Sequence, residues 1–195
     1  PVGAGFGATL AFGLDATWHW RFLVAHTMTN LLGWIGLTVV GTLVTFWPTI
    51  LRTRMDDRAE GFAKQALPWL IGSGMVVVAG ALAGLQYVAV AGLAGYLLAL
   101  GWWGRVLVAP LRRRPPREFA PASVLAAMIW WLVALVVTGG IVLTTPISGW
   151  SEVTGTLAVV WAGGFAAQLL TGALSYLLPS VLGGGPRVVR AGAAW

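Results

Sequence analysis

One uncharged segment constrains the fold of this chain more than any other feature. From Phe22 to Ile50 the sequence has 29 residues without an aspartate, glutamate, lysine or arginine. At about 1.5 Å per residue, a helix of this length extends about 43 Å, which is more than the roughly 30 Å hydrocarbon core of a bilayer. We therefore predict that this segment is a transmembrane helix and that the lipid bilayer surrounds it.

The composition extends this prediction to the whole chain. Hydrophobic residues make up 58% of the 195 residues and charged residues only 9%, whereas a soluble domain has about 25% charged residues. Most of the surface must therefore face lipid. The sequence has no cysteine, which excludes disulfides, thiolate metal sites and cysteine nucleophiles.

Further apolar segments predict an all-α, polytopic helix bundle. The run 66–109 is too long for one span, and we place a turn around Gln86 and Tyr87. Five full spans result, over residues 22–50, 67–86, 89–109, 123–143 and 154–178.

The N-terminal segment 1–14 is apolar but too short to cross a bilayer, so we expect it to form a partial or re-entrant helix. Residues 1–195 are interpreted as a single transmembrane domain. Because the first residue is Pro1, we expect a processed form or a piece of a longer chain.

The positive charges predict the orientation of the bundle. Ten of the twelve lysines and arginines lie in the three segments 51–65, 110–122 and 183–195. The positive-inside rule places these segments in the cytoplasm, and we expect the membrane to be a bacterial plasma membrane. This distribution explains the net charge of +6 without a nucleic-acid partner. The run Arg112–Arg114 is interpreted as a topogenic signal, with binding of anionic lipid as the alternative.

Polar residues inside the first span mark the main candidate site for a cofactor. His26 and Asn30 are one helical turn apart, and Gly33 continues the same face. Polar side chains in a span usually face the bundle interior, because exposure to lipid is costly. His26 is the principal candidate ligand of haem iron or copper. The alternative is a histidine that only forms a hydrogen bond between packed helices.

Other residues are weaker candidates. His19, about 10.5 Å from His26 along the helix axis, cannot oppose it as an axial ligand of one haem, but it is a candidate ligand of a different metal centre. Met75 and Met128 are candidate haem-iron ligands, although methionine more often fills a core. Gln168 and Ser175 share one face of the last span, where they either line a cofactor or quinone pocket or support helix packing.

Two segments carry a resemblance to a known family. They are AHTMTNLLGWIGLTVVGTLVTFWPTILRTRM (25–55) and AAQLLTGALSYLLPSVLGGGP (166–186). Together they resemble the membrane part of bacterial multicopper-oxidase and copper-nitrite-reductase-like proteins, which is related to the catalytic subunits of haem–copper oxidases. The family pattern at the first segment is H-x-H-x-N-L-L-G-[WF]-x-G. The chain matches it from His26 to Gly36, except that Met28 replaces the second histidine.

The resemblance implies a redox role, with haem b or copper bound in the bundle and electrons passed to an outward cupredoxin domain. The replacement at Met28 affects any site that needs both imidazoles. The chain has no cysteine, and neither of its histidines lies in a β-rich segment. The resemblance therefore implies that a cupredoxin domain, or another redox subunit, belongs to further sequence or to a separate chain.

Three functional hypotheses remain open. The first is a membrane electron-transfer module that passes electrons from the quinol pool to an external copper domain, as part of an oxidoreductase. The second is a non-catalytic anchor or assembly subunit of a larger complex, which includes a homo-oligomer. The third is a small-molecule transporter or receptor. No P-loop, H-E-x-x-H or G-x-S-x-G motif occurs, and no acidic pair lies inside a span.

Overall fold

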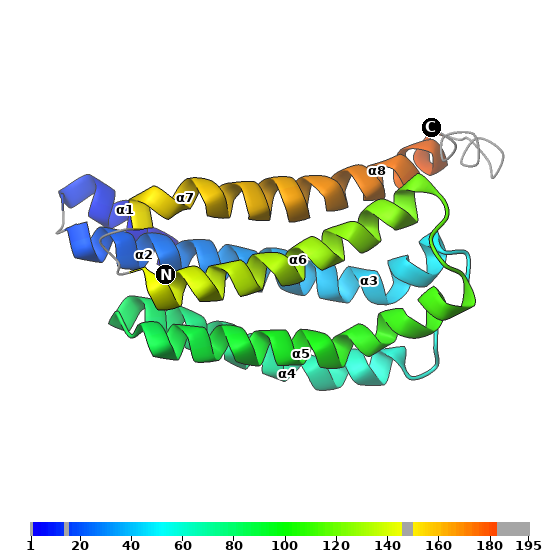
Figure 1. Cartoon of the computed structure of the whole chain (residues 1–195), viewed down its shortest axis with the longest axis horizontal. Helices are drawn as coiled ribbons and strands as arrows, with labels where there is room; N and C mark the ends of the chain where they lie inside the picture. Colours follow the sequence, from blue (N-terminus) through cyan, green and yellow to red (C-terminus); the bar gives the residue numbers. More distant parts are fainter. Residues whose placement is uncertain (1, 14–15, 146–149, 183–195) are drawn as a thin grey trace.

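The computed structural model describes residues 2–13, 16–145 and 150–182, and these ranges contain helices but no strand. Five of the helices are long and apolar enough to cross a membrane. They run side by side along the long axis of the molecule (Figure 1), which confirms the predicted all-α transmembrane bundle. The predicted cytoplasmic tail, residues 183–195, lies outside the described residues.

The first and last spans each consist of three consecutive helical segments. The first span contains α2 (Ala16–Met28), the π-helix η1 (Thr29–Gly36) and α3 (Leu37–Ile50). The last span contains α7 (Trp150–Ala158), the π-helix η3 (Val159–Ala167) and α8 (Gln168–Val181). The spans between them are single helices, namely α4 (Ala59–Ala83), α5 (Gln86–Arg113) and α6 (Phe119–Thr144).

Several helix boundaries differ from the sequence prediction. α4 begins at Ala59 rather than near residue 67, because the polar segment before the apolar run is also helical. An ion pair of 2.7 Å between Glu60 and Lys64, one turn apart, supports this first part of α4. In the last span the helix continues through Pro179 to Val181 instead of breaking at the proline. Transmembrane helices tolerate proline where neighbouring groups satisfy the freed carbonyl.

The predicted turn inside the long apolar run is present and short. Gly84 ends α4 with a φ of +73°, a left-handed conformation that glycine adopts without strain. The Leu85 amide donates to the Gly80 carbonyl at 2.8 Å, which satisfies a carbonyl at the end of the helix. Since α5 begins at Gln86, that residue belongs to the helix and not to the turn.

Glycines let α4 and α5 approach each other closely. A Cβ added to Gly80 would lie 2.6 Å from the backbone nitrogen of Ala89, and one added to Gly92 would lie 2.7 Å from that of Val77. Only glycine fits at such distances, and small residues of this kind are typical of helix contacts in lipid. α4 and α5 therefore form one tight hairpin (Figure 1).

The centre of the bundle is filled by aromatic rings around α6. This helix packs against α5 on one side and against η3 and α8 on the other. Trp131 of α6 stacks on Phe165 of η3 with ring centroids 5.1 Å apart. Tyr96 of α5 and Trp161 of η3 contact this pair edge-on. All four residues are buried, so the middle of the bundle is closely packed.

The short helix α1 (Val2–Phe12) packs against α2 on the outside of the bundle. Gly3 faces the His26 ring and Gly5 faces the Phe22 ring, so the two helices are antiparallel. This agrees with the expectation of an apolar segment that does not cross the membrane alone.

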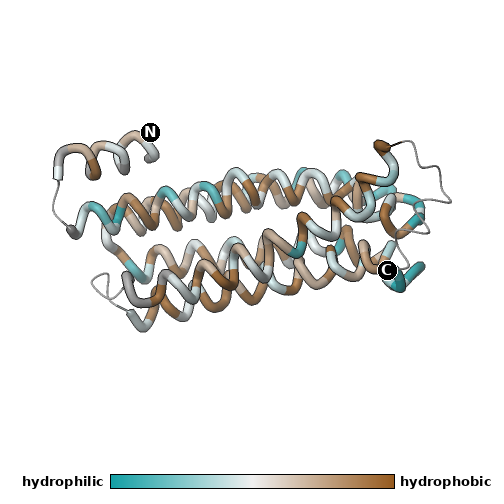
Figure 2. Tube along the Cα trace, turned by 90° about the horizontal axis from the view of Figure 1, so that it is seen from above, coloured by the Kyte–Doolittle hydropathy of each residue, from teal (hydrophilic) through white to brown (hydrophobic). Residues whose placement is uncertain are grey.

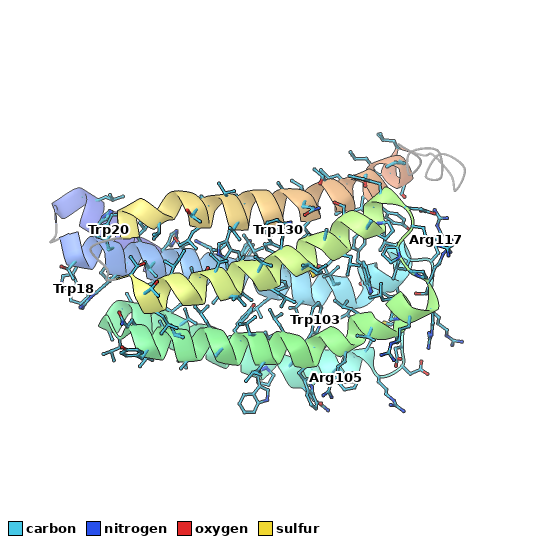
Figure 3. The ribbon with its side chains drawn as sticks, viewed as in Figure 1. Trp18, Trp20, Trp103, Arg105, Arg117 and Trp130 are labelled. Carbon is cyan, nitrogen blue, oxygen red and sulfur yellow. The ribbon has the colours of Figure 1, made fainter. Side chains whose placement is uncertain are left out.

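The two ends of the bundle differ in polarity. Segments 51–58 and 114–118 connect helices at one end, and Figure 2 shows hydrophilic residues concentrated there. Figure 3 places Arg117 at this end and Trp18 at the opposite end. The structure thus brings two of the three predicted positive segments together, which is what alternating spans require.

Candidate functional site

The His26–Asn30 pair lies on the outer surface of the first span. The side-chain nitrogen of Asn30 is 3.1 Å from Nε2 of His26, so the two residues share a face as predicted. His26 is half-buried and Asn30 is exposed. Trp34, one turn further along, is 78% exposed. The expectation that these polar residues face the bundle interior is therefore wrong for Asn30.

The apolar residues of the same span explain this orientation. Ala25, Met28 and Leu32 are buried, and they recur at the spacing of one helix face. This apolar face packs against the core of the bundle. The opposite face, with Asn30 and Trp34, therefore points away from the bundle.

The imidazole of His26 is contacted from two directions. The Asn30 amide lies at Nε2, and a Cβ added to Gly3 would lie 3.4 Å from both Nδ1 and Cε1. The proton position follows from the orientation assigned to the Asn30 amide. With the amide nitrogen at Nε2, the Asn30 N–H group donates to Nε2, which accepts with its lone pair.

The other predicted metal ligands have three different surroundings. The ring of His19 lies edge-on to Trp20, with centroids 5.7 Å apart. Met128 is buried in the main apolar cluster, whereas Met75 is 66% exposed on α4. Across residues 2–13, 16–145 and 150–182, no group of three or more histidine, aspartate or glutamate side chains could hold a metal ion.

Gly33 and Met75 line a common groove between the first span and α4. The groove has a volume of about 440 Å³, and Thr29 is its polar side chain among mostly aliphatic neighbours. His26 does not line it. The structure therefore separates Gly33 from the face of His26 and Asn30, and the lining of the groove suits an apolar chain.

The polar stripe of the last span takes part in helix packing. The Ser123 hydroxyl of α6 donates to the backbone carbonyl of Gln168 at 3.0 Å, and the Ser175 hydroxyl donates to the Gly172 carbonyl at 2.8 Å. A Cβ on Gly172 would lie 3.0 Å from that of Ser123. The two contacts with Ser123 join the last span to α6 and agree with the packing alternative, whereas the Ser175 bond stays within its own helix. The quinone pocket at Gln168 and Ser175 stays a prediction.

The first π-helix docks on a residue that the sequence analysis did not single out. The Tyr96 hydroxyl donates to the Leu32 carbonyl at 2.8 Å in a buried position. Gly36, also in η1, leaves the space for this hydroxyl, since an added Cβ would overlap it. π-helical turns shift backbone carbonyls out of the α-helical hydrogen-bond pattern. The sequence signal for this contact was Tyr96 itself, the one tyrosine inside the predicted span 89–109.

The second π-helix docks in a related way. The Trp161 Nε1–H group donates to the Thr138 hydroxyl at 3.0 Å, and that hydroxyl donates to the Ala134 carbonyl at 2.7 Å. A Cβ on Gly164 would lie 2.7 Å from the Trp130 indole. Both π-helices thus join an outer span to the central helices through a buried polar contact.

Arg21 places a positive charge at the end of the bundle opposite the arginine-rich connections. Its Nε atom is buried without a hydrogen-bond partner, and its guanidinium packs against Gly84 and over the Trp18 ring. A cavity of about 40 Å³ beside it is also lined by Gln86 and Thr138. That volume suits about one water molecule, which would supply the missing acceptor.

Comparison of the chain with protein-family models, curated proteins and solved structures gives no match. The class of protein therefore follows from the fold and the site alone. The described residues contain five helices that could span a membrane, which defines a multi-pass helical membrane protein. Its distinguishing feature is a hydrogen-bonded histidine–asparagine pair on the outside of the first span.

Proposed function

We propose that this chain is a membrane-embedded assembly subunit. Its first span binds a transmembrane helix of another protein through a surface formed by His26, Asn30 and Trp34, which we name the polar face. The observation that carries the proposal is the exposure of Asn30. The span runs from Thr17 to Ile50, and Asn30 lies about 20 Å along it from Thr17, which is deep in the hydrocarbon region.

The energetic cost of this arrangement supports a partner helix. A carboxamide has two N–H donors and an oxygen with two lone pairs, and the contact with His26 uses one of these groups. Lipid tails offer no partner for the rest. A side chain on a neighbouring helix would supply such a partner, and its hydrogen bond would contribute about 0.6–2 kcal/mol to helix association. The exposed ring of Trp34 extends the contact area along the same face.

The proposal includes an orientation. The arginine-rich segments 51–58 and 114–118 lie at one end of the bundle (Figure 1). We assign this end to the cytoplasm of a bacterium by the positive-inside rule. The polar face then lies in the outward half of the first span.

The size of the complex in native membranes tests the assembly role. We expect Asn30→Leu to release the chain from its complex, so that blue-native electrophoresis shows a smaller species. Thr45→Leu is the matched control, because Thr45 is an exposed polar residue of the same span that bonds to its own helix. A complex of unchanged size in Asn30→Leu would contradict the proposal.

A second candidate function is electron transfer by haem or copper. The specific observation that favours it is the pairing of His26 with Asn30 inside a span, because ionisable residues within a span commonly mark a functional site. The packed aromatic centre leaves no space for a haem there, so His26 would hold the cofactor on the polar face. The bound metal would supply one-electron chemistry, and His26 would supply the ligand.

A reduced-minus-oxidised absorption spectrum tests this second candidate. A b-type haem band, or a copper signal, that is lost in His26→Ala and kept in His19→Ala would support it. Protein that is saturated with haem and copper during expression and still shows neither signal would exclude it. Quinol as the electron donor and a cupredoxin domain as the acceptor are tested only after that result.

A further inference from the structure

The arginine-rich end of the bundle contains a cavity of about 310 Å³. Its walls are the end of α3, the two residues after it, and the connection between α5 and α6 with the adjoining helix ends. Four arginines line it together with one carboxylate, Glu118. These arginines are Arg52, Arg113, Arg114 and Arg117. Figure 3 shows Arg117 beyond the helix ends, on the loop side of the bundle.

The single carboxylate does not neutralise this cavity. Glu118 is paired with Arg52 at 3.2 Å. Arg113 donates to the backbone carbonyl of Arg54 at 3.3 Å. Within the part of the chain that the structure describes, the ion pairs do not involve Arg114 or Arg117. The cavity thus keeps a net positive charge at the level where the bundle meets water.

The backbone holds the lining in place. Arg52 has a φ of +53°, a left-handed conformation that is costly for a residue with a Cβ. Two backbone hydrogen bonds hold this turn against the end of α3. The Arg52 amide donates to the Thr49 carbonyl, and the Thr53 amide donates to the Pro48 carbonyl. Pro115 and Pro116 restrict the segment that carries Arg114 and Arg117. Strained or restricted backbone at a charged cavity is a feature of binding sites.

We infer that this cavity binds a phosphate group, with Arg114 and Arg117 as the principal donors. The planar guanidinium fork matches phosphate oxygens, and charge-assisted bonds of this kind are strong. The phosphate belongs either to the headgroup of an anionic phospholipid or to a soluble phosphate compound. Neither the assembly role nor the redox role requires this site, so it is an additional function of the chain.

Lipid binding by the detergent-purified full chain tests the inference. Native mass spectrometry measures the affinity for phosphatidylglycerol, with zwitterionic phosphatidylcholine as the comparison lipid and inorganic phosphate as the soluble competitor. The site variant is Arg114→Gln with Arg117→Gln. The matched control is Arg58→Gln with Arg112→Gln, because these two exposed arginines do not line the cavity. Circular dichroism of both variants verifies that they are folded.

We expect the site variant to bind phosphatidylglycerol about thirtyfold more weakly, since each cavity arginine that contacts the headgroup contributes about 1 kcal/mol, whereas the control arginines lie outside the cavity. The control should stay within about twofold of the wild type. Displacement of the lipid by millimolar inorganic phosphate would identify a soluble phosphate as the ligand, and no displacement would identify the lipid headgroup. Equal losses in the two variants, or equal binding of both lipids, would overturn the inference.

Discussion

The Tyr96 hydroxyl donates a hydrogen bond to the Leu32 carbonyl oxygen at 2.8 Å, and this contact joins α5 to the π-helix of the first span. Tyr96 and Leu32 are both buried. Because water does not reach this depth, the carbonyl has no substitute donor if the hydroxyl is removed. The contact therefore ties the span that carries the polar face to the central helices.

Tyr96→Phe is expected to lower the free energy of unfolding by about 1–2 kcal/mol, because it leaves the Leu32 carbonyl without a partner. Denaturant unfolding in detergent, followed by circular dichroism, measures the change. Tyr87→Phe is the control, since the Tyr87 side chain is 72% exposed on the same helix. Equal stability of the two variants would show that the contact contributes nothing.

Thr138→Val is expected to destabilise the last span by a similar amount, about 1–2 kcal/mol, because the buried Trp161 N–H group loses its acceptor. Thr144→Val is the matched control. Thr144 lies on the same helix and is exposed, and its hydroxyl donates only to the carbonyl of Gly140. Tryptophan fluorescence during unfolding reports on both variants. A larger loss of stability in Thr144→Val than in Thr138→Val would contradict the account of how η3 packs against α6.

Gly92→Ala is expected to lower the free energy of unfolding by about 1–3 kcal/mol, because the added methyl group would press α5 away from the α4 backbone. Gly101→Ala serves as the control. It has no neighbouring atom within 4 Å of an added Cβ, and alanine is the better helix former. The comparison uses the midpoint of thermal unfolding in the same detergent. A stabilising Gly92→Ala would refute the close packing of α4 and α5.

The proposed orientation of the chain predicts the labelling of single cysteines, for which the cysteine-free sequence is well suited. A membrane-impermeant maleimide should label Tyr87→Cys in intact cells. It should label Arg58→Cys only after the cells are opened. Both residues are exposed, and they lie at opposite ends of the bundle. The reverse pattern would place the arginine-rich end outside.

The spans were predictable from hydropathy because lipid permits little except long apolar helices. The turn at Gly84 was predictable for a related reason, since the mostly apolar run of 44 residues from 66 to 109 exceeds one bilayer crossing. The start of α4 was not predictable from hydropathy, because its first turns are polar. The ion pair between Glu60 and Lys64 supports them. The π-helices were also missed, since they result from packing against Tyr96, Trp130 and Thr138 rather than from a local sequence pattern.

The candidate site was predictable only in part. The spacing of His26 and Asn30 correctly placed them on one face of the span, where the structure brings them within hydrogen-bond distance. It did not determine which side of the span faces the core, because that depends on the larger apolar face of Ala25, Met28 and Leu32. The cavity at Arg114 and Arg117 requires two connecting segments that are far apart in sequence. Its shape was therefore not available from the charge pattern alone.

Site-specific photo-crosslinking tests the assembly role most directly. A photoreactive phenylalanine derivative replaces Trp34 on the polar face or, as the control, Trp69 on α4, which is similarly exposed at 71%. We predict a protein adduct in native membranes from position 34 only, mapped by mass spectrometry to a transmembrane helix and lost when Asn30→Leu is added. Identical lipid adducts from both positions, or a protein adduct that persists in Asn30→Leu, would contradict the proposal.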